Sequence, residues 1–492
     1  MTVLKSNVEV PDGGWGWAVV GGAAMTNMFN QSLISLFGLL FGQQIGVLGH
    51  GTSEAALIMN LNSVVTNFSG LVTGPMLKKY SVRKVAVAGS LLTATGLMIS
   101  SQARSLWLIL FGYSFLTGLG LGFIMPSVFL AVTSYFKVLR GRAVGLAAAG
   151  TGLGQMVMPH AVRALLDEYS FRGATLIMAA MALQGVVGAS LFQPVKNHMK
   201  PVNDVPTEKK SLLDPILTPD TSDAEESDDS VLLKNKNCKN CVDCVEAGKN
   251  NDKLNIKNCE KKHIEEENER DDAPLISVQR TCWKKFISLM DLDLLKDLTF
   301  LNIVFGVALA YTASINFSML FPFFLQESAG LNRADTAMCM SVLAGADIVS
   351  RLTLPTITQI LGFSCRLSYL IGAAALILAR ALLAEQKSYT GLIAISALCG
   401  YVRAATVVNQ NLVLSEHCKA SRLPAALGLG MCVKGAFVIT IGQFLGWLRD
   451  YTGSYSLCIH AQNILLILIV ITWVPELLYK YCKRKSDKLP LR

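Results

Sequence analysis

The stretch Met340-Ser-Val-Leu-Ala-Gly-Ala-Asp-Ile-Val-Ser-Arg351 is an apolar run that contains one acid, Asp347, and one base, Arg351. Residues four apart lie on one face of an α-helix about one turn from each other, so a helix would stack this carboxylate against the guanidinium. The flanking residues 336–346 and 352–365 carry no other charge. We therefore predict a membrane span whose charges face a partner or a water-filled cavity, because a charge at bilayer depth costs roughly 2.5 to 3.5 kcal/mol.

The rest of the chain has the composition of an integral membrane protein. Of its 492 residues 52% are hydrophobic and 16% charged, and the mean hydropathy is +0.43. Charge-free windows of roughly 20 residues, long enough to cross about 30 Å of hydrocarbon, recur along it. We predict an all-α membrane protein with twelve membrane-spanning helices, six on each side of a long polar insertion. Their centres lie near Met28, Val65, Leu92, Leu121, Gly152, Ala182, Tyr311, Val349, Ala375, Thr406, Phe437 and Ile467.

The basic residues of the loops predict the orientation in the membrane. They cluster at 78–84, 137–142 and 480–488, after predicted spans two, four and twelve, which puts both termini and the insertion in the cytoplasm. The net charge of +9 follows from this pattern, so a nucleic-acid partner is not indicated. The predicted parts are an N-terminal tail (1–12), a six-helix bundle (13–192), a disordered cytoplasmic linker (193–297) with a short amphipathic helix at 289–298, a second six-helix bundle (298–479) and a basic tail (480–492).

Two motifs stand at the starts of predicted spans one and five. The first is Asp12, Gly13, Gly14, Trp15, Gly16 and Trp17, whose tryptophans suit an interfacial aromatic belt and whose glycines let the backbone bend or approach a neighbour. The second begins with Tyr135 and Phe136, continues through a basic turn with Arg140, and places Gly145 and Gly150 at a spacing that allows close helix packing.

These motifs resemble the signatures of the monocarboxylate transporter family, solute carrier family 16, within the major facilitator superfamily. Residues 74–84 are similar to the superfamily's loop between spans two and three. The resemblance covers both predicted bundles and leaves out the insertion. It implies the major facilitator fold and a secondary or facilitative transporter of a monocarboxylate or related organic anion or zwitterion, working by alternating access. A coupled proton and a single-span immunoglobulin-type glycoprotein chaperone are known for some members and stay open for this divergent chain.

In the family, an Asp and an Arg four apart in span eight bind the substrate carboxylate and take part in proton coupling, and Asp347 and Arg351 match them. The pair could instead be a gate salt bridge without substrate contact.

Proton-linked lactate carriers have a Lys in the first span, where this chain has Ser35. Lactate and proton coupling are therefore in doubt, and aromatic amino acids, thyroid hormones, creatine or carnitine are alternative substrates. Further candidates inside spans are Lys434, Arg403 (which could also snorkel from a helix end), Asn30, Gln31, Asn316, Asn27, His160 and Asn409.

Other functions find less support. The chain has no Gly-rich phosphate loop and no Ser, His and Asp constellation in a polar setting, so we expect neither an enzyme nor a cofactor. Zinc-like spacing is present at Cys238, Cys241, Cys244, Cys259 and His263. In a linker without a mini-core these cysteines are expected to be free thiols, so no metal is predicted.

Three patterns of an acid followed by a Leu-Leu or Leu-Ile pair lie at 208–213, 228–233 and 271–276. They resemble sorting signals, so an endosomal or lysosome-related membrane is the alternative to the plasma membrane.

Two other classes of function are less consistent with the sequence than transport. The first is a transport-incompetent receptor or scaffold that uses the long linker to recruit partners. It has no reason to keep Asp347 and Arg351 at bilayer depth. The second is a channel, which is disfavoured because the sequence shows no repeated ring of charges and no pore loop.

Overall fold

The computed structural model describes residues 8–9, 11–50, 52–201 and 290–486. The cysteines with zinc-like spacing, the acid-Leu-Leu-type patterns and most of the predicted linker lie outside these residues. Of the short helix expected at 289–298, the structure describes a 3₁₀ helix, η6 (Leu292–Lys296).

The first half of the chain is helical apart from a two-residue strand, β1 (Val8–Glu9), which pairs with β2 (Lys200–Pro201). Its helices are α1 (Trp15–Thr26), η1 (Asn27–Gln31), α2 (Leu33–Val47), α3 (Thr52–Phe68), α4 (Gly70–Lys79), α5 (Val82–Ser100), α6 (Leu106–Ile109), η2 (Leu110–Thr117), α7 (Gly118–Tyr135), α8 (Arg140–Ala182), α9 (Gln184–Ser190) and η3 (Val195–Asn197). The second half follows η6 with α12 (Leu298–Phe323), η7 (Phe324–Ser328), α13 (Arg333–Ile360), α14 (Cys365–Glu385), α15 (Tyr389–His417), α16 (Leu423–Thr452) and α17 (Tyr455–Ser486).

The all-α prediction is confirmed, and the helices are consistent with twelve spans. Each predicted centre falls within a helical segment. By length and composition, nine helices among the described residues could each cross a membrane. One of them, residues 140–190, contains two predicted centres and bends at Ser170, whose φ is 55°. The stretches 15–47 and 52–79 are broken into shorter helices, so neither counts as one long apolar helix.

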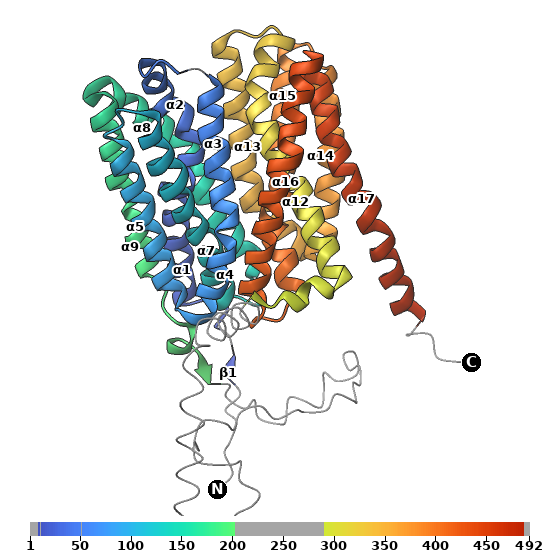
Figure 1. Cartoon of the computed structure of the whole chain (residues 1–492). Helices are drawn as coiled ribbons and strands as arrows, with labels where there is room; N and C mark the ends of the chain where they lie inside the picture. The colour runs from blue at the N-terminus through green and yellow to red at the C-terminus, as the bar shows by residue number, and fades with distance from the viewer. Residues whose placement is uncertain (1–7, 10, 51, 202–289, 487–492) are drawn as a thin grey trace, which may run out of the picture. The chain divides into compact units, whose positions relative to one another are not determined.

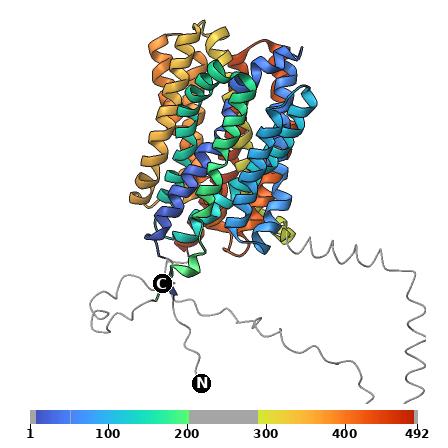
Figure 2. The same cartoon turned by 90° about the vertical axis from the view of Figure 1, so that its left-hand side faces the viewer.

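Figure 1 shows the first half, coloured blue to green, beside the second half, coloured yellow to red. Seen after a quarter turn, the helices of both halves run between the same two ends (Figure 2). We call the end that carries residues 78–84, 137–142 and 418–423 the basic end. Contacts bring these loops together: Gln359 at the end of α13 donates to the carbonyl of Val138 (3.4 Å), and a Cβ on Gly74 would lie 3.2 Å from the carbonyl of Pro424.

The two motifs of the first half form one joint at the basic end. The Oδ1 atom of Asp12 accepts hydrogen bonds from the backbone N–H groups of Lys137 (2.7 Å), Val138 (3.0 Å) and Leu139 (3.3 Å). The ring of Trp17 meets that of Phe136 edge to face, with centroids 5.1 Å apart. A carboxylate that accepts several backbone N–H groups is a strong local tie. The joint therefore holds the start of α1 against the turn that begins α8.

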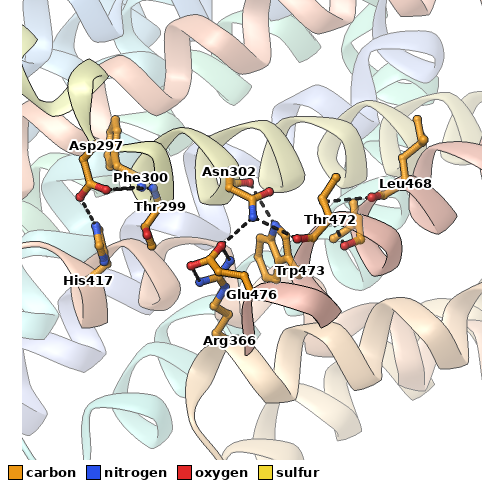
Figure 3. Close-up of polar contacts among 11 residues, drawn as sticks. Asp297, Thr299, Phe300, Asn302, Arg366, His417, Leu468, Thr472, Trp473 and Glu476 are labelled. Carbon is orange, nitrogen blue, oxygen red and sulfur yellow. Dashed lines mark hydrogen bonds and ion pairs between the residues drawn. The ribbon is translucent and has the colours of Figure 1, made fainter. Parts of the chain in front are cut away.

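Charged groups also fasten the basic end of the second half (Figure 3). Arg366 of α14 forms a bidentate pair with Glu476 of α17, at 2.7 and 2.6 Å. Asn302 of α12 donates to the same carboxylate (2.7 Å), and the Arg366 guanidinium lies over the ring of Trp473 (4.9 Å). This cation is thus matched by its own carboxylate, and the network ties α12, α14 and α17 together.

Asp297 caps α12 by accepting hydrogen bonds from the N–H groups of Thr299 and Phe300, and it pairs with His417 at the end of α15 (2.7 Å) (Figure 3). Burial alone would raise the pKa of the Asp297 carboxyl. The hydrogen bonds from His417, Phe300 and Thr299 outweigh burial and hold that pKa below its usual value. The cap is therefore present at neutral pH and would be lost only as the pH falls through this lowered pKa.

The two halves meet along two seams in the part of the bundle nearer the basic end. In the first, α4 approaches α16 so closely that a Cβ on Gly70 would lie 2.5 Å from the carbonyl oxygen of Gly428. In the second, α8 approaches α13, and a Cβ on Gly145 would lie 2.4 Å from the carbonyl oxygen of Arg351. An ion pair between Lys78 and Asp291 also joins the halves. Glycine is required here because any side chain would force the helices apart.

We predict that Asp12→Ala lowers stability by about 1 to 2 kcal/mol, because three backbone N–H groups lose their acceptor. The measurement is the melting temperature of the purified protein in detergent. Asp12→Asn keeps an acceptor oxygen and should lose less than half as much. Equal losses in the two variants would contradict the capping role.

Candidate functional site

The predicted pair of Asp347 and Arg351 forms on α13, whose first turn is capped by Asn332. The Nε atom of Arg351 donates to Oδ2 of Asp347 at 2.7 Å, and both side chains are only 4% exposed. Arg351 also donates through Nη1 to the carbonyl of Ala148 in α8, at 2.8 Å. The pair therefore lies where the second half meets the first, and its guanidinium touches both halves.

Arg403 joins this pair from the middle of α15. Its Nε atom lies 3.9 Å from Oδ1 of Asp347, and its side chain is 19% exposed. That distance makes an ion pair and is too long for a hydrogen bond. The alternative that Arg403 snorkels from a helix end is wrong, because the residue lies at the centre of α15 (Tyr389–His417). One carboxylate therefore faces two guanidiniums.

Lys434 of α16 is 6% exposed, and the groups that it contacts are uncharged. Its Nζ atom donates to Oε1 of Gln410 in α15, at 3.3 Å, and lies 5.2 Å from the ring centroid of Tyr311 in α12. The Tyr311 hydroxyl accepts a hydrogen bond from Asn67 of α3 (3.4 Å), across the two halves. Among the described residues, no carboxylate lies within ion-pair distance of this ammonium.

The sequence analysis missed Arg380, a fully buried side chain of α14. Its Nη1 atom donates weakly to the carbonyl of Ala313 (3.4 Å), and its guanidinium lies 4.3 Å from the ring centroid of Phe317. In the part of the chain that the structure covers, Nε and Nη2 have no hydrogen-bond partner. Arg380 is the one charged residue in the apolar stretch 367–384. The rule that selected Arg403, an ionisable residue inside a predicted span, therefore selects Arg380 as well.

The asparagine candidates donate hydrogen bonds to backbone carbonyls rather than to the charged groups. Asn30 is fully buried and donates to the carbonyls of Thr26 (3.2 Å) and Ala182 (3.3 Å), which ties η1 to the last turn of α8. Gln31 is half-buried beside it. The other hydrogen bonds run from Asn316 to Thr312, from Asn27 to Ala147 and from Asn409 to Ala405, while His160 is exposed.

The charges in the described interior are strongly unequal between the halves. All five charged side chains that are buried belong to the second half, and Asp347 is the acid among them; the cations are Arg351, Arg366, Arg380 and Lys434. After Arg351 is assigned to Asp347 and Arg366 to Glu476, two buried cations and the half-buried Arg403 have no carboxylate of their own. Such an interior favours an anion, because buried charge is tolerated when it is paired.

Comparisons with known proteins agree with the sequence resemblance. A family model described as Major Facilitator Superfamily matches residues 20–447. Monocarboxylate transporter 12 of Rattus norvegicus is 25% identical over 448 residues, which cover 91% of this chain and 82% of the relative. Monocarboxylate transporter 9 of Gallus gallus is 23% identical over 502 residues, covering 98% and 96%. Monocarboxylate transporter 2 of Homo sapiens is 26% identical over 454 residues, covering 91% and 82%.

We predict that Asp347→Asn destabilises the protein by roughly 3 to 5 kcal/mol, because it leaves buried Arg351 without a carboxylate. The double variant Asp347→Asn with Arg351→Gln should lose less than the sum of the two single losses, which a double-mutant cycle of melting temperatures measures. The control is Asp293→Asn, which breaks an exposed pair with Lys296 and should change stability little. An Asp347→Asn protein as stable as this control would contradict the buried pair.

Proposed function

Because this chain belongs to the Major Facilitator Superfamily, we propose that it carries a monocarboxylate or a related organic anion or zwitterion across the membrane by alternating access. The resemblance to monocarboxylate transporters extends over most of the chain, and family members are membrane transporters rather than enzymes. The observation that carries the proposal is the group of Asp347, Arg351 and Arg403 at the meeting of the two halves.

The chemistry of this group suits a carboxylate. A guanidinium offers a planar fork of donors that matches a carboxylate, and Asp347 holds Arg351 in place. Arg351 and Arg403 together exceed Asp347 by one positive charge, and Lys434 adds another. A substrate carboxylate between these cations would offset the excess. We propose Arg351, Arg403 and Lys434 as the substrate-binding cations and Asp347 as the residue that positions the two arginines.

The seams suggest which state of the cycle the structure represents. The glycine contacts of α4 with α16 and of α8 with α13 close the bundle toward the basic end, and the positive-inside pattern assigns that end to the cytoplasm. We infer an outward-facing state that opens inward when these seams separate. Rigid rocking of two halves around a central site is the expected mechanism of such folds.

The neutral surroundings of Ser35 argue for weak proton coupling. Ser35 stands where proton-linked relatives carry a lysine, and its hydroxyl accepts a hydrogen bond from Gln155 of α8 (3.0 Å). Both groups are uncharged and do not titrate near neutral pH. A plasma-membrane location and a single-span immunoglobulin-type chaperone are proposals that rest on the family resemblance.

The test is uptake into liposomes that contain the purified protein. The panel is lactate, pyruvate, aromatic amino acids, creatine and carnitine, at two pH values, with and without a pH gradient. We expect saturable uptake of at least one compound that changes little with the gradient. Uptake of lactate driven strongly by the gradient would contradict our interpretation of Ser35, and absence of saturable uptake across the panel would contradict transport.

We predict that Lys434→Met lowers the kcat/KM for carboxylate uptake at least about tenfold, which corresponds to about 1.4 kcal/mol, and affects neutral analogues much less. The reason is that the variant removes a cation without leaving an ion-pair partner unmatched. The control is Lys84→Met, which removes the same charge from an exposed position of α5. Unchanged carboxylate uptake by Lys434→Met would exclude Lys434 from the site.

A further inference from the structure

Arg380 of α14 is a buried cation for which the described chain supplies no carboxylate. Its side chain is fully buried, and Nη1 donates only a long hydrogen bond, of 3.4 Å, to the carbonyl of Ala313. Nε and Nη2 have no hydrogen-bond partner among the described residues. The ring of Phe317 lies 4.3 Å from the guanidinium, and an aromatic face offsets part of a buried charge without cancelling it.

The charged and ionisable groups near Arg380 do not balance it. Arg403 of α15 is near enough to act on it electrostatically, and that charge is also positive. Cys399 of the same helix acts on it too, but an ordinary thiol is mostly neutral at neutral pH. The one acid of α14, Glu385, is 78% exposed and pairs with His460 at 3.2 Å. A guanidinium keeps its proton in proteins, so burying this one without an anion is costly.

The helices around Arg380 share one buried apolar cluster. It includes Phe317 of α12, Leu383 of α14, Cys399 of α15 and Ile459 of α17. Arg380 contacts the cluster at Phe317 and lies three residues before Leu383, on the same face of α14. The guanidinium is therefore enclosed within the second half rather than open to water.

Gln462 of α17 is a second buried polar group at this level of the bundle. It follows Ile459 by one turn, is fully buried, and has no described partner for either its amide nitrogen or its oxygen. The adjacent Asn463 donates to the carbonyl of Ile377 at 3.3 Å. Because Ile377 lies one turn before Arg380 on α14, this hydrogen bond places Gln462 level with the guanidinium.

Thr312 of α12 adds a third polar group. It precedes Ala313, whose carbonyl accepts the hydrogen bond from Arg380, and its fully buried hydroxyl has no described partner. Native proteins leave few buried polar atoms unsatisfied, and a group of them indicates a bound water or ion. The donors available here are a guanidinium, an amide and a hydroxyl. Since a positive charge is also left to balance, the ligand that suits them is an anion.

We propose that one chloride ion binds at Arg380 inside the second half as the counter-ion of this guanidinium. Chloride is a small spherical monoanion that can accept hydrogen bonds from Arg380, Gln462 and Thr312 together. It needs no opening for an organic tail, which suits a side chain that is fully buried. The ion is a resident of the fold rather than the transported compound, so this proposal does not depend on the function proposed above.

The test is the chloride dependence of the melting temperature of the purified protein in detergent. Sodium chloride replaces sodium gluconate at constant ionic strength, from chloride-free buffer to about 100 mM chloride, because a ligand that binds only the folded state raises the melting temperature. We expect a rise of at least about 2 °C, and a similar rise with bromide. An unchanged melting temperature would overturn the chloride site and leave the transport function standing.

Arg380→Gln distinguishes a counter-ion from a general effect of salt. The variant removes the buried charge, so its melting temperature in gluconate should equal or exceed that of the unmodified protein, and its response to chloride should be lost. If Arg380 only fills space, the variant would lose the same stability in both salts, which would contradict the proposal. The matched control is Arg403→Gln, which removes a half-buried cation of the candidate site and should keep the full response. Loss of the response in this control would place the ion at the candidate site instead.

Gln462→Met gives a second test that leaves the guanidinium in place. The substitution keeps the volume of the side chain and removes its amide donor. The chloride concentration that gives half of the rise in melting temperature should therefore increase several-fold. An unchanged concentration would place the ion away from Gln462 and overturn the site as proposed.

Discussion

The carboxylate of Asp347 is the interaction on which the interior of the second half depends. It holds Arg351 by a hydrogen-bonded ion pair and attracts Arg403 from a neighbouring helix. Without it, two guanidiniums would face each other in a space nearly withdrawn from water, a charge arrangement that a membrane protein does not tolerate without compensation. The buried cations of the described second half that have no carboxylate, Lys434 and Arg380, have aromatic rings and neutral groups around them instead. Those contacts lower the cost of burial but do not cancel the charge.

Small residues lie between this charged group and the basic end of the bundle, where α8 packs closely against α13. Gly145 lets α8 approach the backbone of Arg351 itself, and the next turn of α8 presents the carbonyl of Ala148 to the guanidinium. The site and the seam therefore share the same residues. Separation of α8 from α13 would remove an acceptor from Arg351, so the state of the seam and the hydrogen bonding of the site are physically linked.

The Asp12 joint extends this link to the start of the chain. Asp12 accepts hydrogen bonds from the N–H groups of the turn that precedes α8. The same helix, α8, provides the carbonyl of Ala148 to which Arg351 donates. Gly150 of the second motif fits against the backbone of α1, where a Cβ would lie 2.2 Å from the carbonyl oxygen of Ala24. The two motifs thus fix the position of the helix that faces the candidate site.

The sequence by itself determined the membrane-spanning class, the helical segments and the spacing of Asp347 and Arg351, because hydrophobic length and the pitch of a helix are local properties. The motifs also identified the family. The tertiary structure alone decided which side chains that are distant in the sequence lie close together. In the structure Arg403 lies beside Asp347, and Asn30 hydrogen bonds to a neighbouring helix rather than to a charged group. Arg366 pairs with Glu476, whereas Lys434 donates to the neutral amide of Gln410. Contacts between helices depend on how far each helix is rotated and how closely glycines let neighbours approach, and neither quantity is encoded by periodicity along one segment.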